Sequence, residues 1–313
     1  MKVLNIKSFA PVGVTQQNRA SGVKNNPKCD VFVKSNDISF GSNATIAAKL
    51  DSFLPDLYNY ILHSKKLSLE GVGEIAQNAS PGLLVKALKD APVDATSSSR
   101  AAFYNCAYSI SSDMKTVSAG AKSIYLGIPD EPTVRNRLVF MNDVAHEMTH
   151  IFQEESCDRI SKLQFIQKFL DKELSNAAKL DTLNAIAVIF NEAETKMQQP
   201  LLRALNKKDI IPCPVKTLSH KLLNDTYIED SHISVDDYIK GTILSTMNKF
   251  SSKYADMDRN TILEYMQLTA KNEREAYLNS GYLVKRALGI KSPVDTEYRV
   301  LLYDRFANVA AEM

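Results

Sequence analysis

Residues 133–155 read TVRNRLVFMNDVAHEMTHIFQEE, and this stretch decides how the rest of the chain is interpreted. Apolar residues recur three or four positions apart along it, which is the spacing of one face of an α-helix. The members of that stripe are Val134, Leu138, Met141, Ala145, Met148 and Phe152. Thr133 precedes the pattern and can cap the first turn with its hydroxyl oxygen. We therefore predict a helix that begins after Thr133 and ends near Glu155.

The same helix would carry His146 and His150 on one face. Side chains four residues apart leave a helix from the same side, so both imidazoles can converge on a single metal ion. Glu147 follows the first histidine, rotated by about 100°, where its carboxylate can contact a water on the metal rather than the metal itself. Zinc lowers the pKa of such a water toward about 7, and the carboxylate can accept its proton. The pattern predicts a hydrolytic zinc site with Glu147 as general base.

A catalytic zinc ion usually has three protein ligands, so a third has to come from elsewhere in the chain. The range 261–288 predicts one long helix, and Glu273 falls in the middle of its apolar stripe. A carboxylate on a packed face is costly unless it is paired or binds a metal. Glu275 belongs to a face that we interpret as wetter. Glu192 is the rival of Glu273, because it lies closer to the motif in the sequence.

The segment HEMTH at 146–150, together with the downstream helical segment EREA at 273–276, resembles the gluzincin branch of zinc metallopeptidases. The resemblance implies a zincin-like catalytic domain that acts on a peptide or protein substrate. It also implies one zinc ion per chain, with His146, His150 and Glu273 as ligands and Glu147 as general base.

Two features depart from the commoner gluzincin pattern. The separation between the second histidine and Glu273 is long, and Tyr277 stands where many relatives place an aspartate that orients a histidine ligand. In zincins generally, a strand beside the motif helix presents an edge that a bound peptide can extend. The resemblance and the order in the chain make 123–128 the candidate for that strand.

Outside the motif, the sequence predicts mainly helices and one small β region. Residues 1–43 are rich in Asn, Ser and Lys without sustained periodicity, which is typical of an extended or disordered leader. From residue 44 to about 91 the pattern turns helical. Its apolar positions are Ile46, Leu50, Leu54, Leu57 and Ile61. Aromatic and branched residues predict strands at 102–108 and 123–128, the only convincing β region. After residue 157 almost everything predicts helix, with breaks near Pro200, Pro212–Pro214, Ser231 and Gly289.

We therefore predict an α+β, predominantly helical protein with a single zincin-like catalytic domain over residues 44–313. Its expected parts are N-terminal helices (44–99), a small sheet with the motif helix (100–156), a helical insertion (157–260) and C-terminal helices with the third ligand (261–313).

Composition excludes several classes of partner. The chain has 38 basic and 36 acidic residues, so its formal charge of +2 gives no footprint for nucleic acid. No apolar run is long enough to span a bilayer, and the first residues do not form a secretory signal. Four widely spaced cysteines without a CxxC pair favour reduced thiols. We expect a cytoplasmic protein, or one exported without a cleavable signal peptide.

Two other functions remain open at this point. Peptide deformylases share the motif helix and take an upstream cysteine as a ligand, which here would be Cys106, although the residues around it lack the glutamate and glycine of that family. A non-catalytic helical interaction protein with a residual metal site is the other alternative. The presence of Glu147 weighs against it.

Overall fold

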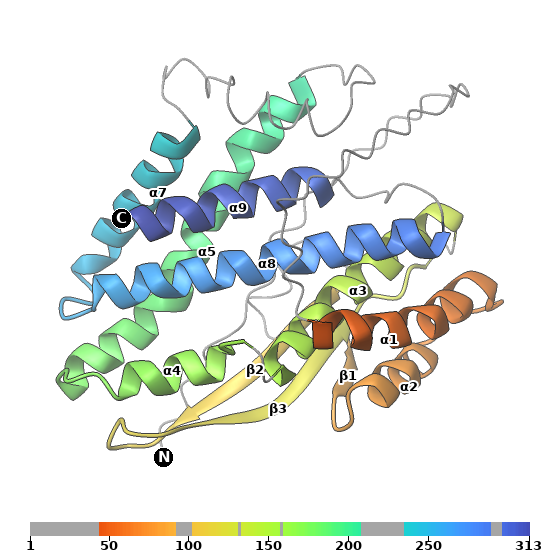
Figure 1. Cartoon of the computed structure of the whole chain (residues 1–313), viewed down its shortest axis with the longest axis horizontal. Helices are drawn as coiled ribbons and strands as arrows, with labels where there is room; N and C mark the ends of the chain where they lie inside the picture. Colours follow the sequence, from red (N-terminus) through yellow and green to blue (C-terminus); the bar gives the residue numbers. More distant parts are fainter. Residues whose placement is uncertain (1–43, 92–101, 131–132, 157–158, 208–234, 289–295) are drawn as a thin grey trace.

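The computed structural model describes residues 44–91, 102–130, 133–156, 159–207, 235–288 and 296–313 (Figure 1). The predicted leader and the predicted breaks at 212–214, Ser231 and Gly289 lie outside these ranges. In chain order, the helices and strands are α1 (Ala44–His63), α2 (Leu69–Ala79), β1 (Leu84–Ala87), the 3-10 helix η1 (Leu88–Asp90), β2 (Ala102–Ile110), β3 (Val117–Leu126), α3 (Val134–Glu155), α4 (Lys162–Leu170), α5 (Asn176–Lys207), α7 (Val235–Ser251), α8 (Arg259–Leu288) and α9 (Thr296–Glu312). The described chain is mostly helical with one small sheet, as expected for the α+β class.

The motif helix α3 has the boundaries that the sequence predicts. Thr133 is its N-cap, and the hydroxyl oxygen accepts a hydrogen bond from the backbone nitrogen of Asn136 at 3.2 Å. The apolar stripe is buried from Leu138 to Phe152. Val134 is the exception, with 71% of its surface exposed, because the first turn of α3 is exposed on all sides. The prediction of the helix is therefore confirmed, and the inclusion of Val134 in its buried face was wrong.

The sheet has three strands in the order β1-β3-β2. The central strand β3 is parallel to β1 and antiparallel to β2. The sequence did not predict β1, which lies outside the expected β region. The proposed peptide-binding edge at 123–128 was also wrong, because residues 123–126 pair with β1 on one side and with β2 on the other. Strand β2 also contacts α3, and in the described sheet one of its edges is not paired with another strand.

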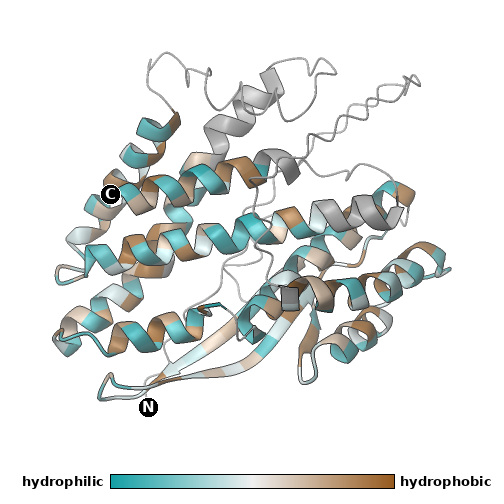
Figure 2. Ribbon diagram, viewed as in Figure 1, coloured by the Kyte–Doolittle hydropathy of each residue, from teal (hydrophilic) through white to brown (hydrophobic). Residues whose placement is uncertain are grey.

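Helix α3 lies between the sheet and α8, where it contacts β2, β3 and α8 (Figure 1). Helix α1 packs along α3, α9 packs along α8, and α5 contacts both α7 and α8. Buried apolar residues from α1 through α9 form one continuous core. Apolar and polar residues alternate along the helices in Figure 2, as amphipathic helices around a shared core require. The fold thus places the motif helix at the centre, in contact with the sheet and with the long C-terminal helix.

The helical region after the motif differs from the prediction at Pro200. A proline inside a helix removes one backbone hydrogen bond and costs about 3 kcal/mol, so a break was expected there. Helix α5 instead continues through Pro200 to Lys207. The preceding turns carry buried apolar side chains such as Phe190 and Met197, which anchor the helix to the core. Tertiary packing outweighs the local preference at this position.

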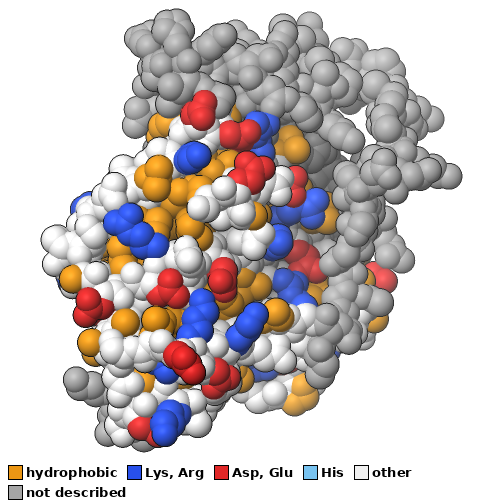
Figure 3. Space-filling view, turned by 60° about the vertical axis from the view of Figure 1, so that its left-hand side comes forward, with side chains coloured by type: hydrophobic (Ala, Val, Ile, Leu, Met, Phe, Trp, Pro, Cys, Tyr) orange, Lys and Arg blue, Asp and Glu red, His pale blue; other side chains and the backbone are white. Residues whose placement is uncertain are grey.

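Two observations concern the surface. Among the described helices, none combines the length and the apolar character needed to cross a membrane. On the face shown in Figure 3, acidic and basic side chains are interspersed rather than gathered by sign.

Candidate metal centre

The structure brings His146, His150 and Glu273 together at one buried point between α3 and α8. One ligand atom from each residue can be chosen so that all three lie within 4.8 Å of one another. The two histidine Nε2 atoms are 3.2 Å apart. One oxygen of Glu273 faces each histidine, at 3.3 Å from His146 Nε2 and 3.3 Å from His150 Nε2. Two histidines of one helix and a glutamate far away in the sequence thus meet at a common centre.

The spacing of these atoms has the dimensions of a metal site. Ligands at about 2.0–2.1 Å around a tetrahedral ion are separated from one another by roughly 3.3–3.4 Å. Each observed separation is close to that edge length: 3.2 Å between the two Nε2 atoms, and 3.3 Å from each Nε2 to its own oxygen of Glu273. Moreover, Glu273 Oε2 makes no hydrogen bond with any described residue, although it is buried and close to His146. A carboxylate oxygen left without a donor in this position fits a cation as its missing partner.

Glu273 and the two histidines are buried together, and the charge of each group shifts the pKa of its neighbours. Both histidines are 4% exposed and Glu273 is 1% exposed. Burial alone raises the pKa of Glu273, but His150 and His146 outweigh it and leave this pKa well below its ordinary value. Burial lowers the pKa of His150, and the charge of Glu273 reverses that effect and raises the pKa overall. In the metal-free protein, Glu273 therefore stays ionised, and its negative charge favours the protonated form of His150.

The carboxylate of Glu147 contacts the sheet. Its Oε2 accepts a hydrogen bond from the backbone nitrogen of Tyr104 in β2, at 2.9 Å, and the residue is 4% exposed. The ring of Tyr104 stacks on His150, with 6.1 Å between the ring centroids. Glu147 and His150 thus share Tyr104 as a neighbour. The rotation of about 100° between adjacent helical residues places the carboxylate beside the centre rather than in it.

His150 is oriented by a hydrogen bond to Gln153, whose Oε1 lies 2.8 Å from His150 Nδ1. Gln153 also donates to Glu275 Oε2 at 2.8 Å, and Arg159 forms an ion pair with that carboxylate. Glu275 is 6% exposed. The interpretation that Glu275 lies on a wetter face was therefore wrong, because its partners come from α3 and from the segment that follows it. Its carboxylate is used in these contacts and does not belong to the group of three.

His146 has a different environment. Its Nδ1 is buried and has no hydrogen-bond partner among the described residues. The ring of Tyr277 packs against it, with 4.2 Å between centroids, and the Tyr277 hydroxyl accepts a hydrogen bond from Arg299 Nη1 at 2.8 Å. The sequence resemblance placed Tyr277 where many gluzincins have an orienting aspartate. In this chain, ring packing stands in place of that hydrogen bond.

The other candidate ligands lie elsewhere. Glu192 forms ion pairs with Lys196 at 2.7 Å and with Lys249 at 2.8 Å. Cys106 is buried in β2 and is not part of the group of three. The structure therefore gives no support to Glu192 as a ligand, nor to the deformylase-like alternative that depends on Cys106.

Sequence reasoning did not single out Gln153, Tyr104 or Arg159. A signal existed for Gln153, which follows His150 by three residues and therefore shares its helix face. Tyr104 and Arg159 reach the site only through the tertiary fold, and nothing in their local sequence marks them.

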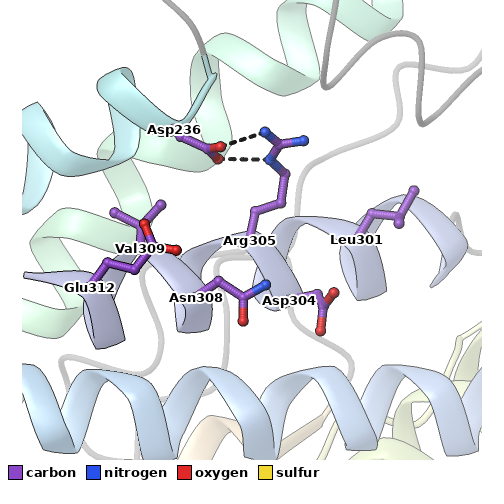
Figure 4. Close-up of a pocket in the computed structure, with 7 residues that line it drawn as sticks. All are labelled: Asp236, Leu301, Asp304, Arg305, Asn308, Val309 and Glu312. Atoms are coloured by element: carbon purple, nitrogen blue, oxygen red, sulfur yellow. Dashed lines mark hydrogen bonds and ion pairs between the residues drawn. The ribbon is translucent and has the colours of Figure 1, made fainter. Parts of the chain in front are cut away.

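A hollow of about 290 Å³ lies on α7 and α9, lined by residues outside the group of three (Figure 4). Its charged residues are largely matched, since Arg305 forms a two-pronged ion pair with Asp236 at 2.6 and 2.8 Å. No cluster of metal ligands is found there among the described residues. The candidate functional centre is therefore the group at the histidines rather than this hollow.

No protein-family model, no curated protein and no solved structure matches this chain. The function of the site is accordingly inferred from its own geometry and chemistry.

Proposed function

We propose that this protein is a zinc-dependent hydrolase, and specifically a peptidase, with a zincin-like catalytic unit. His146, His150 and Glu273 would hold the ion, and Glu147 would act as general base. The observation that carries the proposal is the buried group of His146, His150 and Glu273, beside a glutamate on the motif helix. The two histidine Nε2 atoms are 3.2 Å apart, and each lies 3.3 Å from a different oxygen of Glu273. Two histidines and one carboxylate are a ligand set of catalytic zinc sites, which leave one position for water or substrate.

The surroundings of Glu147 favour a peptide as substrate. The backbone nitrogen of Tyr104 points to Glu147, so it is directed away from β3 and belongs to the outer edge of β2. An extended peptide can bind such an edge through main-chain hydrogen bonds. A peptide placed there would run past Glu147 and the two histidines.

The roles of the residues follow from their positions. A zinc ion in the centre would lower the pKa of a coordinated water and polarise the carbonyl of the scissile bond. Glu147 accepts the proton of the attacking water as its oxygen bonds to the carbonyl carbon. As the carbon–nitrogen bond breaks, Glu147 gives that proton to the leaving amine. The hydrogen bond from Tyr104 holds Oε2 of Glu147 and leaves Oε1 outside that bond, available for the proton.

The test combines metal analysis with one substitution. We expect purified protein to contain about one equivalent of zinc, and Glu147→Gln to retain it, because Glu147 is not a ligand. The amide cannot accept a proton, so hydrolysis of a random peptide library or of unfolded proteins should fall by about 10²–10⁴-fold. Glu74→Gln, an exposed substitution on α2, is the matched control and should keep wild-type turnover. Absence of zinc uptake, or full turnover in Glu147→Gln, would contradict the proposal.

A further inference from the structure

The side chain of Gln153 joins the motif helix to α8 at one buried position. Its Nε2 donates to the backbone oxygen of Asn272 at 3.0 Å and to Glu275 Oε2 at 2.8 Å. These two residues flank Glu273 on α8. Because the amide nitrogen is directed at acceptors on α8, the amide oxygen of Gln153 has to face His150.

This orientation fixes the tautomer of His150. Gln153 Oε1 lies 2.8 Å from His150 Nδ1, and an amide oxygen only accepts hydrogen bonds, so Nδ1 carries the proton. In the neutral ring Nε2 is then unprotonated, and it is the atom that faces His146 Nε2 and Glu273 Oε1. A metal ion binds a histidine through the lone pair of an unprotonated ring nitrogen. Which nitrogen is unprotonated depends on the hydrogen bond that the other nitrogen makes.

Arg159 and Glu275 hold Gln153 in place. Glu275 Oε2 accepts hydrogen bonds from Gln153 and from Arg159 Nη1, and Arg159 Nη2 donates to Asn272 Oδ1. Gln153, Asn272 and Glu275 are all buried, so water cannot readily replace these contacts. We call these four residues the Gln153 network. It fixes α8 to α3 at Asn272 and Glu275, on either side of Glu273.

We propose that Gln153 is a positioning residue for the metal centre. It holds His150 in the tautomer whose Nε2 lone pair faces the ion, and it fixes the stretch of α8 that carries Glu273. This inference rests on the proposed function, because it assigns Gln153 a role at the same centre.

The first test is zinc affinity, measured by competition with a chromophoric chelator. Gln153→Leu keeps the approximate size of the side chain and removes both its donor and its acceptor. We expect its affinity for zinc to fall by about 10–100-fold, as for other residues that orient a ligand. Gln77→Leu is the matched control, since Gln77 donates one hydrogen bond to Leu83 away from the centre, and its affinity should equal that of the wild type.

A rescue experiment separates positioning from a general loss of packing. Gln153→Glu keeps an acceptor for His150 but places two carboxylates side by side, so its zinc affinity should also fall. Adding Glu275→Gln again pairs one amide with one carboxylate, because residue 275 then carries the amide and residue 153 the carboxylate. The hydrogen bond between the two side chains is kept, but residue 275 is now its donor. We expect the double variant to regain affinity relative to Gln153→Glu alone. A double variant no better than the single one would overturn the positioning role.

The tautomer of His150 provides a measurement that needs no metal. In metal-free wild type at a pH where the ring is neutral, ¹⁵N NMR should show a protonated Nδ1, and Gln153→Leu should shift the ring toward the Nε2-protonated form. An unchanged zinc affinity or an unchanged tautomer in Gln153→Leu overturns the inference and leaves the proposed function standing. If wild-type protein binds no zinc, the proposed function fails, and the tautomer alone then decides the role of Gln153.

Discussion

At the scale of single residues, the proposed zinc ion would have to displace a proton from His150 when the pH is low enough for its ring to be protonated. Glu273 raises the pKa of His150 against the opposing effect of burial, so the protonated imidazole persists to higher pH than in water. Below that raised pKa, a zinc ion bound by His150 would displace a proton from its ring. Above it, His150 is already neutral and contributes no pH dependence.

We therefore predict that zinc affinity falls as the pH is lowered through the raised pKa of His150. The fall approaches about tenfold per pH unit for each proton displaced. Competition titrations between pH 8 and pH 5.5, with a chelator of known pH dependence, measure it. Glu273→Gln removes the charge that raises the pKa, so whatever affinity it retains should begin to fall only at lower pH. A wild-type affinity that does not change over this range would show that His150 loses no proton on binding.

At the scale of elements, Glu155 at the end of α3 connects three other parts of the fold. Its carboxylate accepts from Lys49 of α1 at 2.7 Å and from Ser80 after α2 at 2.5 Å, and it pairs with Lys122 of β3. Burial raises the pKa of Glu155, but these three contacts outweigh it and leave the pKa below its ordinary value. The ionised form is thus preferred in the folded state. Its stabilising effect is present above the unfolded pKa of about 4.3 and is lost as the pH falls below that value.

We predict that Glu155→Gln lowers the free energy of unfolding by about 1–2 kcal/mol at pH 7, because hydrogen bonds to a charged group are lost while the two lysines remain partly hydrated. The difference from wild type should shrink toward pH 3. Urea denaturation of the metal-free proteins at both pH values measures it. Glu74→Gln, which is exposed, should change the free energy by less than about 0.5 kcal/mol. An equal loss at both pH values would mean that the charge of Glu155 is not responsible.

The elements that the sequence predicted well are those with local signals. Helix α3 has a cap residue and a long apolar period, and both are visible without knowledge of the fold. Strand β1 has only four residues, and its pairing with β3 depends on contacts far along the chain. A local signal did precede it, since Pro81 and Gly82 occupy the middle of a turn closed by the hydrogen bond from Leu83 to Ser80. Gly82 has φ +83°, which the second central position of a type II turn requires.

The candidate site also has a part with a local sequence signal and a part that only the fold assembles. The spacing of His146, Glu147 and His150 is a property of one helix, so the sequence alone indicates that they act together. Glu273 was selected from its position on an apolar stripe, and the structure places its carboxylate beside both histidines. Its role as a zinc ligand stays a prediction. The burial of Glu275 could not be predicted, because the charge that compensates it belongs to Arg159, which is far away in sequence.

At the scale of the whole molecule, the proposed ion would connect α3 to α8, with α4, α5 and α7 in the chain between them. A ligand that binds only the folded state stabilises it by about 2.7 kcal/mol when its free concentration is 100 times the dissociation constant. The entropy of unfolding grows with chain length, so for 313 residues each kcal/mol raises Tm by about 1.5–2 °C. Zinc should therefore raise the Tm of the wild type by about 4–5 °C. Binding of zinc to cysteines and histidines of the unfolded chain would make this rise smaller.

The same measurement identifies the third ligand. Glu273→Gln removes the carboxylate that faces both histidines, so we expect zinc to produce little or no rise in Tm. Glu192→Gln is the matched control, because it removes a glutamate whose ion pairs with Lys196 and Lys249 lie near the surface and contribute little to stability. Its rise in Tm with zinc should equal that of the wild type. Scanning calorimetry of the three proteins, each after treatment with a chelator and again after addition of zinc, separates the effect of the metal from that of the substitution. A full rise in Glu273→Gln together with its loss in Glu192→Gln would reverse the assignment, and α5 rather than α8 would then complete the centre.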